Sequence, residues 1–226
     1  AGFIRYGRIR ENLRLKLPEA EFFDHGYNLG FQKKIQTKFS PYLAGFSDSD
    51  GNAMNFDYQI PDDNTNPDGY FKLFTQDPNE DNALSKILKY DMIIFKSCFP
   101  VTKITSDQML NDYKHYFEEI KKVFLNYPEK TFLALTPPPL RSELTKPEYA
   151  ARARIFSNWL VNEFPKNLNN TFALDVFDLL AEKSNPKFIN TLKRDFCKTL
   201  PFDSHPNREG SKMAGEELVE KVRNYK

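Results

Sequence analysis

The clearest structural signal in this chain is the segment Asp91-Met92-Ile93-Ile94-Phe95-Lys96-Ser97-Cys98-Phe99-Pro100. Its apolar run at 92–95 is rich in β-branched and aromatic residues, which is typical of a strand buried on both faces. After a turn at 97–105, apolar residues spaced by three and four run from Met109 to Phe124 and predict an amphipathic helix. The stretch therefore predicts a buried strand followed by a helix.

Two further stretches repeat this pattern. Residues 131–135, with the apolar run 132–135, are predicted to be a second buried strand, which ends at the prolines 137–139 because proline cannot donate to a strand ladder. A helix at 147–164 follows, residues 172–177 return as a third strand, and residues 208–224 form a terminal helix. Alternating strands and helices with short connections are typical of right-handed βαβ crossovers. The sequence predicts one parallel sheet with helices on both faces.

The upstream part of the chain is less regular. Residues 21–23 are predicted to be a short first strand of the same sheet, preceded by an N-terminal extension at 1–20. Residues 46–81 are predicted to be an acidic loop excursion with a short β segment at 54–60. We detect no internal repeat, so we expect residues 1–226 to form a single domain.

Composition excludes several classes of protein. The 32 Lys and Arg balance 31 Asp and Glu, so we expect no nucleic-acid partner. The longest apolar runs have about four residues, which predicts no membrane span, and the first twenty residues contain no apolar segment of signal-peptide type. Cys98 and Cys197 are too few for a disulfide scaffold or a four-ligand zinc site. We expect two free thiols, with a single bridge as the alternative, and neither a metal nor another cofactor.

Ligands of open parallel sheets bind beyond the carboxyl ends of the strands, which directs attention to 24–30, 96–100, 136–140 and 202–207. In the last segment, His205 precedes a helix and can present one ring nitrogen to a reacting proton while the nearby Asp203 orients the other. The alternative interpretation is that Asp203 only caps a turn and His205 is incidental.

Two other segments contain candidate site residues. His25 and Gly26, with Asn28 in the same segment, could form a pocket of backbone donors, or simply a tight turn that needs glycine. Ser97 and Cys98 are candidate nucleophiles: Cys98 if a nearby base lowers its pKa, and Ser97 if His205 reaches it. The alternative is that small residues at a strand end only pack or turn.

Together these motifs resemble the SGNH, or GDSL-like, hydrolase superfamily from about residue 21 to the end. Residues 203–207, Asp-Ser-His-Pro-Asn, resemble its D-x-x-H-P-N segment. Residues 135–139 are similar to its proline-rich strand exit, and residues 175–180 to its following strand. The resemblance implies a three-layer α/β/α sandwich with a parallel, flavodoxin-like sheet, and ester hydrolysis with His205 as general base.

The chain departs from this family at the nucleophile. Family members carry Ser after the first strand, whereas the matching stretch 23–26 offers His25 or Gly26. The family places its Asp three residues before the His, but Asp203 lies two residues before His205. The resemblance therefore implies a divergent member that lacks the usual Ser.

Two further family positions are matched by alternatives. The oxyanion glycine corresponds to Gly69 or Gly45, and the asparagine after the middle strand corresponds to Ser97 or Cys98. Of the family's site residues, only His205 transfers directly.

Three functions follow, from different classes. The first is an esterase or carbohydrate O-deacetylase acting on a small-molecule or carbohydrate ester, with Ser97 or Cys98 as a displaced nucleophile and backbone donors near Gly26. The second is a catalytically silent relative that binds a glycan or another ligand in the same cleft, which the aromatic residues near the loops favour. The third is an interaction domain that uses the acidic excursion. We favour the first, because His-Pro-Asn with an adjacent acid exceeds what a non-catalytic loop needs.

Overall fold

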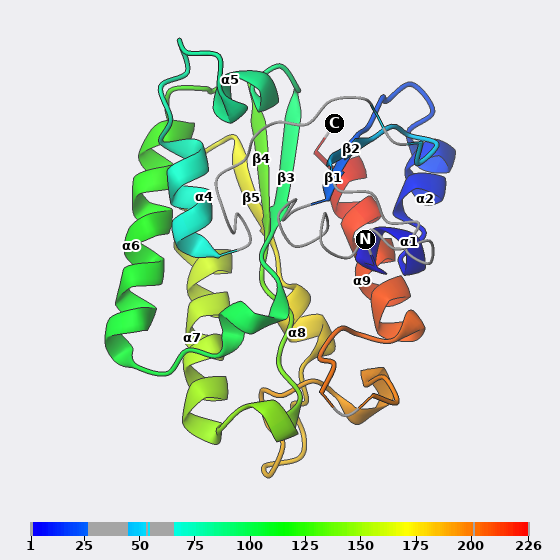
Figure 1. Cartoon of the computed structure of the whole chain (residues 1–226), viewed down its shortest axis with the longest axis vertical. Helices are drawn as coiled ribbons and strands as arrows, with labels where there is room; N and C mark the ends of the chain where they lie inside the picture. The colour runs from blue at the N-terminus through cyan, green and yellow to red at the C-terminus, as the bar shows by residue number, and fades with distance from the viewer. Residues whose placement is uncertain (1, 27–44, 53, 55–65, 201, 226) are drawn as a thin grey trace.

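Three parallel strands, β3 (Met92–Lys96), β4 (Thr131–Leu135) and β5 (Thr171–Leu174), form the central sheet of the computed structural model, in the order β3-β4-β5. The structure describes residues 2–26, 45–52, 54, 66–200 and 202–225. Figure 1 shows helices on both sides of this sheet. The chain is a three-layer α/β/α protein, as its sequence predicts.

The helices differ greatly in length. In chain order, the α-helices within the described residues are α1 (Gly2–Tyr6), α2 (Ile9–Lys16), α4 (Pro67–Phe74), α5 (Ala83–Ile87), α6 (Asp107–Phe124), α7 (Pro147–Asn162), α8 (Val176–Leu180) and α9 (Arg208–Arg223). Short 3₁₀ segments occur at η1 (Phe99–Thr102), η2 (Ser142–Leu144) and η3 (Arg194–Phe196).

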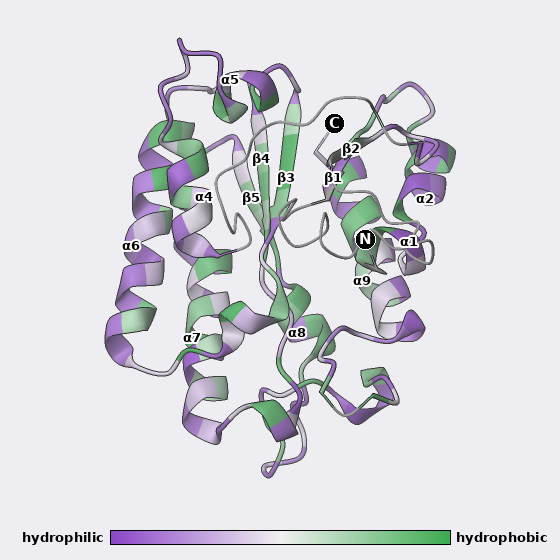
Figure 2. Cartoon of the chain, in the orientation of Figure 1, coloured by the Kyte–Doolittle hydropathy of each residue, from purple (hydrophilic) through white to green (hydrophobic). Residues whose placement is uncertain are grey.

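One face of the sheet packs against α4, α6 and α7 through a core rich in phenylalanine. Phe95 and Phe132 project from the strands into this core, and the ring of Phe132 stacks on that of Phe124 with 3.6 Å between centroids. Helix α6 begins after Ser106, whose side chain accepts a hydrogen bond from the Met109 N–H. In Figure 2, β3 is largely green and the outer side of α6 largely purple, as expected for an amphipathic covering helix.

The opposite face packs against α1, α2, α8 and α9. Leu133 and Leu135 point to this side, so β4 is buried on both faces, as a central parallel strand must be. The region predicted as an N-terminal extension contributes Ile9 and Leu13 to this core. Its first helix ends directly on α9, because a Cβ added to Gly215 would lie 2.5 Å from the backbone oxygen of Gly7.

The predicted first strand at 21–23 does not belong to the parallel sheet, and that prediction is wrong. Strand β1 (Asp24–Gly26) pairs antiparallel with β2 (Gly45–Ser47) in a separate two-stranded sheet. The Phe22 N–H instead donates to Ser49 Oγ at 3.2 Å, and that hydroxyl donates back to Phe22 O at 2.9 Å. A side chain therefore satisfies the backbone where the sequence suggested a strand ladder.

The third strand is shorter than predicted. It ends at Leu174 because the Asp175 side chain accepts from the Asp178 N–H at 2.9 Å and so begins α8. Residues 176 and 177, expected in the strand, are the first residues of that helix.

The acidic excursion predicted at 46–81 contains a helix, α4, which the sequence analysis did not anticipate. Pro67 begins it, and Tyr70, Leu73 and Phe74 bury its inner side in the phenylalanine-rich core. The β segment predicted at 54–60 lies outside the described residues, apart from Met54, whose N–H donates to Phe46 O at 2.8 Å.

Candidate functional site

Cys98 lies just after the carboxyl end of β3. Pro100, near the start of the 3₁₀ turn η1, prevents the strand from continuing, so Cys98 lies at the turn between the two elements. The Thr102 hydroxyl closes this turn by donating to Phe99 O at 2.7 Å. Cys98 is therefore held by both a strand end and a hydrogen-bonded turn.

His205 lies just before the start of α9. The Asn207 side chain caps this helix by accepting from the Gly210 N–H at 3.0 Å, and its amide nitrogen donates to Asp195 O at 2.7 Å. The Asn207 backbone N–H also donates to Phe196 O at 2.8 Å. These bonds fix the backbone two residues after His205, which explains the position of the His-Pro-Asn segment without any ligand.

Arg141 braces the loop that leads to His205. Its Nη1 donates to the carbonyls of Lys198 at 2.9 Å and Leu200 at 2.8 Å, and its backbone N–H donates to the hydroxyl of the fully buried Ser204 at 3.1 Å. The segment after β4 is thereby tied to the loop that carries Asp203 and His205.

Asp203, His205 and Cys98 form a continuous chain of polar contacts. The His205 ring Nδ1 lies 2.6 Å from Asp203 Oδ1, which also accepts from the His205 backbone N–H at 2.8 Å. The other ring nitrogen, Nε2, lies 4.0 Å from Cys98 Sγ. The Asp203 carboxylate accepts a hydrogen bond from Nδ1–H, so the proton of the neutral ring is on Nδ1. Nε2 is therefore the nitrogen that can take a proton from the thiol.

Two further side chains hold this chain of contacts in place. The Lys198 ammonium donates to the second carboxylate oxygen of Asp203, Oδ2, at 2.9 Å. The Phe99 ring meets the His205 ring edge to face, with 4.7 Å between centroids. The carboxylate and the imidazole therefore each have a second contact that limits their rotation.

The charges of this site shift two pKa values. Partial burial acts to raise the pKa of Asp203, but hydrogen bonds from His205 and Lys198 outweigh it and lower that pKa to about 2. The hydrogen bond with the Cys98 sulfur raises the pKa of His205, burial acts against this, and Asp203 adds to the rise. Asp203 is therefore a carboxylate at neutral pH, and the site favours a protonated His205.

Of the two predicted nucleophiles, the structure brings Cys98 to His205. Cys98 is 9% exposed, whereas the His205 side chain is 51% exposed, so the sulfur lies beneath a ring that reaches solvent. Ser97 is buried, and among the hydrogen bonds of the described residues none joins its hydroxyl to His205. Within the described residues neither Cys98 nor Cys197 forms a disulfide bond, as expected.

The other predicted site residues lie in different elements. His25 and Gly26 belong to β1, where the His25 ring packs on Phe46 at 4.7 Å and Gly26 pairs with Gly45. Asn28 lies outside the described residues. Gly69 is buried in the first turn of α4.

Three residues of this region escaped the sequence analysis: Arg141, Lys198 and Lys96. Lys198 shares a short loop with Asp203, and this proximity was the one available signal. Arg141 acts through contacts that only the folded chain creates. Lys96 is the last residue of the apolar strand β3, where a cation is unusual, and its Nζ donates to Ser97 O at 3.0 Å.

His205 does not line the cavity that the described residues enclose. A cavity of about 340 Å³ is lined by Ser142, Phe188 and Arg194, among others, and includes none of the predicted site residues. Within the described residues, no group of three His, Cys, Asp or Glu side chains is arranged to hold a metal ion. None of the helices described is both long enough and apolar enough to cross a membrane.

Comparison with known proteins assigns this chain to no family. No family model matches the chain, and no curated protein matches it. Among solved structures, a chain from Streptococcus pneumonia described as a "putative platelet activating factor" is similar, with a TM-score of 0.44 and 16% sequence identity. The match covers 58% of this chain and 59% of that one. A likeness of this size carries no information about activity, which must be argued from the geometry around His205.

Proposed function

We propose that this protein hydrolyses acyl esters, as an esterase or a carbohydrate O-deacetylase, with Cys98 as nucleophile. The observation that supports this most is the chain of contacts from Asp203 through His205 to Cys98. A nucleophile next to a base that a third group orients is the arrangement that covalent catalysis requires. The divergent D-x-x-H-P-N segment, which supplies two of these three residues, supports the same reaction.

In the first step, His205 takes the Cys98 proton on Nε2 and the sulfur attacks the carbonyl carbon of the ester. Asp203 stabilises the resulting imidazolium through the Nδ1 hydrogen bond of 2.6 Å. The 4.0 Å between Sγ and Nε2 is long for a proton transfer, but such contacts commonly shorten when substrate binds.

In the second step, the carbon–oxygen bond of the tetrahedral adduct breaks and the leaving alkoxide takes the proton from His205 Nε2. A thiolate leaves more easily than an alkoxide, so without this proton the adduct would return to substrate. The product is an alcohol and an acyl thioester on Cys98. A protonated His205, which the raised pKa favours, is therefore needed at this point.

Hydrolysis of the thioester completes the cycle. His205 Nε2 takes a proton from water, the water oxygen attacks the thioester carbonyl, and the carbon–sulfur bond breaks. The released thiolate regains a proton from His205, and the acyl group leaves as a carboxylic acid. The half-exposed His205 ring gives water access to this step.

The developing oxyanion needs backbone donors, and we assign the Gly69 N–H to this role. The next residue, Tyr70, donates its hydroxyl proton to Lys96 O at 2.8 Å, which joins the first turn of α4 to the carboxyl end of β3. Glycine carries no side chain that would hinder a substrate oxygen from approaching its backbone N–H.

Turnover of p-nitrophenyl acetate and of an acetylated sugar tests this proposal. We expect Cys98→Ala and His205→Ala each to lose at least about a hundredfold in kcat/KM, because each removes a group that moves in the reaction. Ser97→Ala is the matched control and should keep the parent rate. A parent protein that hydrolyses no ester above the buffer rate contradicts the proposal. Glycan binding that survives in His205→Ala would then favour a catalytically silent relative.

A further inference from the structure

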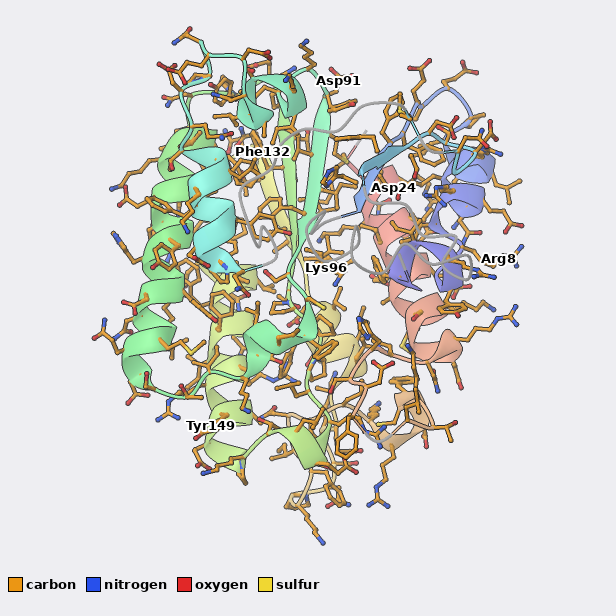
Figure 3. All side chains as sticks on the ribbon, in the orientation of Figure 1. Arg8, Asp24, Asp91, Lys96, Phe132 and Tyr149 are labelled. Carbon is orange, nitrogen blue, oxygen red and sulfur yellow. The ribbon has the colours of Figure 1, made fainter. Side chains whose placement is uncertain are left out.

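The Lys96 ammonium lies at the end of β3, two residues before Cys98, and Figure 3 labels it at the opposite end of that strand from Asp91. Its Nζ donates to Ser97 O at 3.0 Å and lies 5.7 Å from the centroid of the Phe3 ring. A carbonyl oxygen and an aromatic face both attract a cation, but neither neutralises its charge.

This cation is partly buried, and no carboxylate of the described residues lies beside it. Among the ion pairs of the described residues, none joins Lys96 to an Asp or a Glu. Burial lowers the pKa of Lys96, while attraction from the Cys98 sulfur acts to raise it. Taking an ammonium group out of water without a counter-ion costs stability, so the chain gains if a negative charge lies nearby.

The direction of the Lys96 side chain brings it to the same layer as His205. Phe95 points into the phenylalanine-rich core on the α6 side of the sheet, and the next residue, Lys96, contacts Phe3 of α1 on the opposite side. Helix α1 packs on α9, the helix that follows His205. Lys96 therefore reaches the side of the sheet on which α1 and α9 lie, and the loop that carries His205 leads into α9.

We propose that the Cys98 thiolate is the counter-ion of Lys96, and that Lys96 is a positioning residue that stabilises this thiolate once the proton has left the sulfur. Two ionisable groups from different elements then act on the sulfur: Lys96 from β3, and His205 from the loop before α9, with Asp203 and its partner Lys198 behind the imidazole. A cation beside a thiol favours the thiolate, which is the nucleophilic form. The catalytic consequence rests on the proposed function, but the ion pair itself does not.

Ultraviolet absorbance of the thiolate, followed against pH, tests the pair without any substrate. A Cys197→Ser background leaves Cys98 as the single thiol, and subtraction of the trace of a Cys98→Ser variant removes the tyrosine contribution. We expect Lys96→Met to move the midpoint of thiolate formation up by about one pH unit, which is about tenfold less thiolate below the midpoint. Lys96→Arg should restore the parent midpoint, and Lys103→Met, at an exposed lysine nearby, should leave it unchanged. A midpoint that is the same in Lys96→Met and in the parent overturns the proposal.

A reciprocal measurement covers the case in which Lys96→Met does not fold. Lysine side chains are labelled by reductive ¹³C-methylation, and the resonance assigned to Lys96 is titrated in the parent and in Cys98→Ala. Loss of the thiolate should shift the Lys96 titration to lower pH, because the thiolate is what holds the ammonium charged. An unchanged titration overturns the pair. Ester hydrolysis that persists without either shift would support the proposed function alone, and shifts without hydrolysis would support the ion pair alone.

Discussion

The Sγ of Cys98 lies 4.0 Å from the Nε2 of His205, although 107 residues separate them along the chain. The end of β3 fixes one partner, and the capped start of α9 fixes the other. Cys98 follows the end of a sheet strand and His205 lies on the loop that leads into α9, so two elements far apart in the sequence bring the contact about. The contact brings the proposed nucleophile and base near each other, and the 4.0 Å between them must shorten before a proton can pass.

Asp203→Asn should lower the pKa of His205 towards its ordinary value, because the carboxylate is one of the groups that raise it. The kcat/KM for p-nitrophenyl acetate should fall by about ten- to a hundredfold, since the imidazolium loses its stabilising charge. NMR titration of the His205 ring together with steady-state kinetics measures both effects. Asp195→Asn, at an exposed carboxylate before the same loop, is the control. An unshifted His205 titration would refute the role of Asp203.

Folding stability should depend on pH through the same pair. The pKa of Asp203 falls from 3.8 to about 2 on folding, so its contribution is complete above about pH 4 and is lost as the pH falls towards 2. The pKa of His205 rises above 6.5, so its contribution is complete below that value and is lost as the pH rises through the folded pKa. Urea unfolding from pH 2 to 9 should therefore show a stability difference between parent and Asp203→Asn that is largest between about pH 4 and 6. A difference that is constant across this range is the contrary result.

Arg141→Met should loosen the loop that carries Asp203 and His205. Its guanidinium satisfies the carbonyls of Lys198 and Leu200, and leaving these without donors should cost about 1–3 kcal/mol of unfolding free energy. The kcat/KM should fall as well, because the base loses its fixed position. Arg208→Met, at an exposed arginine, provides the control for both readouts. If Arg141→Met matches that control, the loop does not depend on this clamp.

Gly215→Ala should destabilise the contact between α1 and α9. A Cβ at this position would lie 2.5 Å from Gly7 O, so the helices must separate, at a cost of about 1–3 kcal/mol. Thermal unfolding measures the loss, with Glu217→Ala on the exposed side of the same helix as the control. An unchanged melting temperature would mean that α1 does not rest on α9 in solution.

The central strand β4 could be predicted from sequence because a central parallel strand is buried on both faces, and that burial makes 132–135 a continuous apolar run. The run 92–95 is also fully apolar and does form β3, but β3 lies at the edge of the described sheet and its Ile94 is 39% exposed, so the expectation that this strand is buried on both faces is wrong. The segment 21–23 does not belong to the parallel sheet, so its sequence is not shaped by burial between two layers of helices. Its backbone bonds to the Ser49 side chain, and a partner so far along the chain leaves no periodicity to detect.

The part of the site that lies within one short segment could also be predicted from the sequence. Asp203 and His205 are two residues apart, so their pairing follows from the sequence, whereas the choice of Cys98 over Ser97 depends on where β3 ends and how the chain turns. The burial of Lys96 depends on Phe3, which belongs to a helix at the other end of the chain. Contacts between distant elements fix these features, and a single sequence does not record such contacts.

The central claim is that Cys98 carries the acyl group during turnover. The most direct test mixes the Cys197→Ser protein with p-nitrophenyl acetate at low pH, quenches it during the first turnover, and locates the adduct by mass spectrometry of the intact chain and its peptides. We expect one acetyl group per chain, on the peptide that contains Cys98, removable by hydroxylamine as a thioester is, and absent from Cys98→Ala. Hydrolysis that proceeds with Cys98 unmodified, or an acetyl group that persists in Cys98→Ala, would contradict the claim.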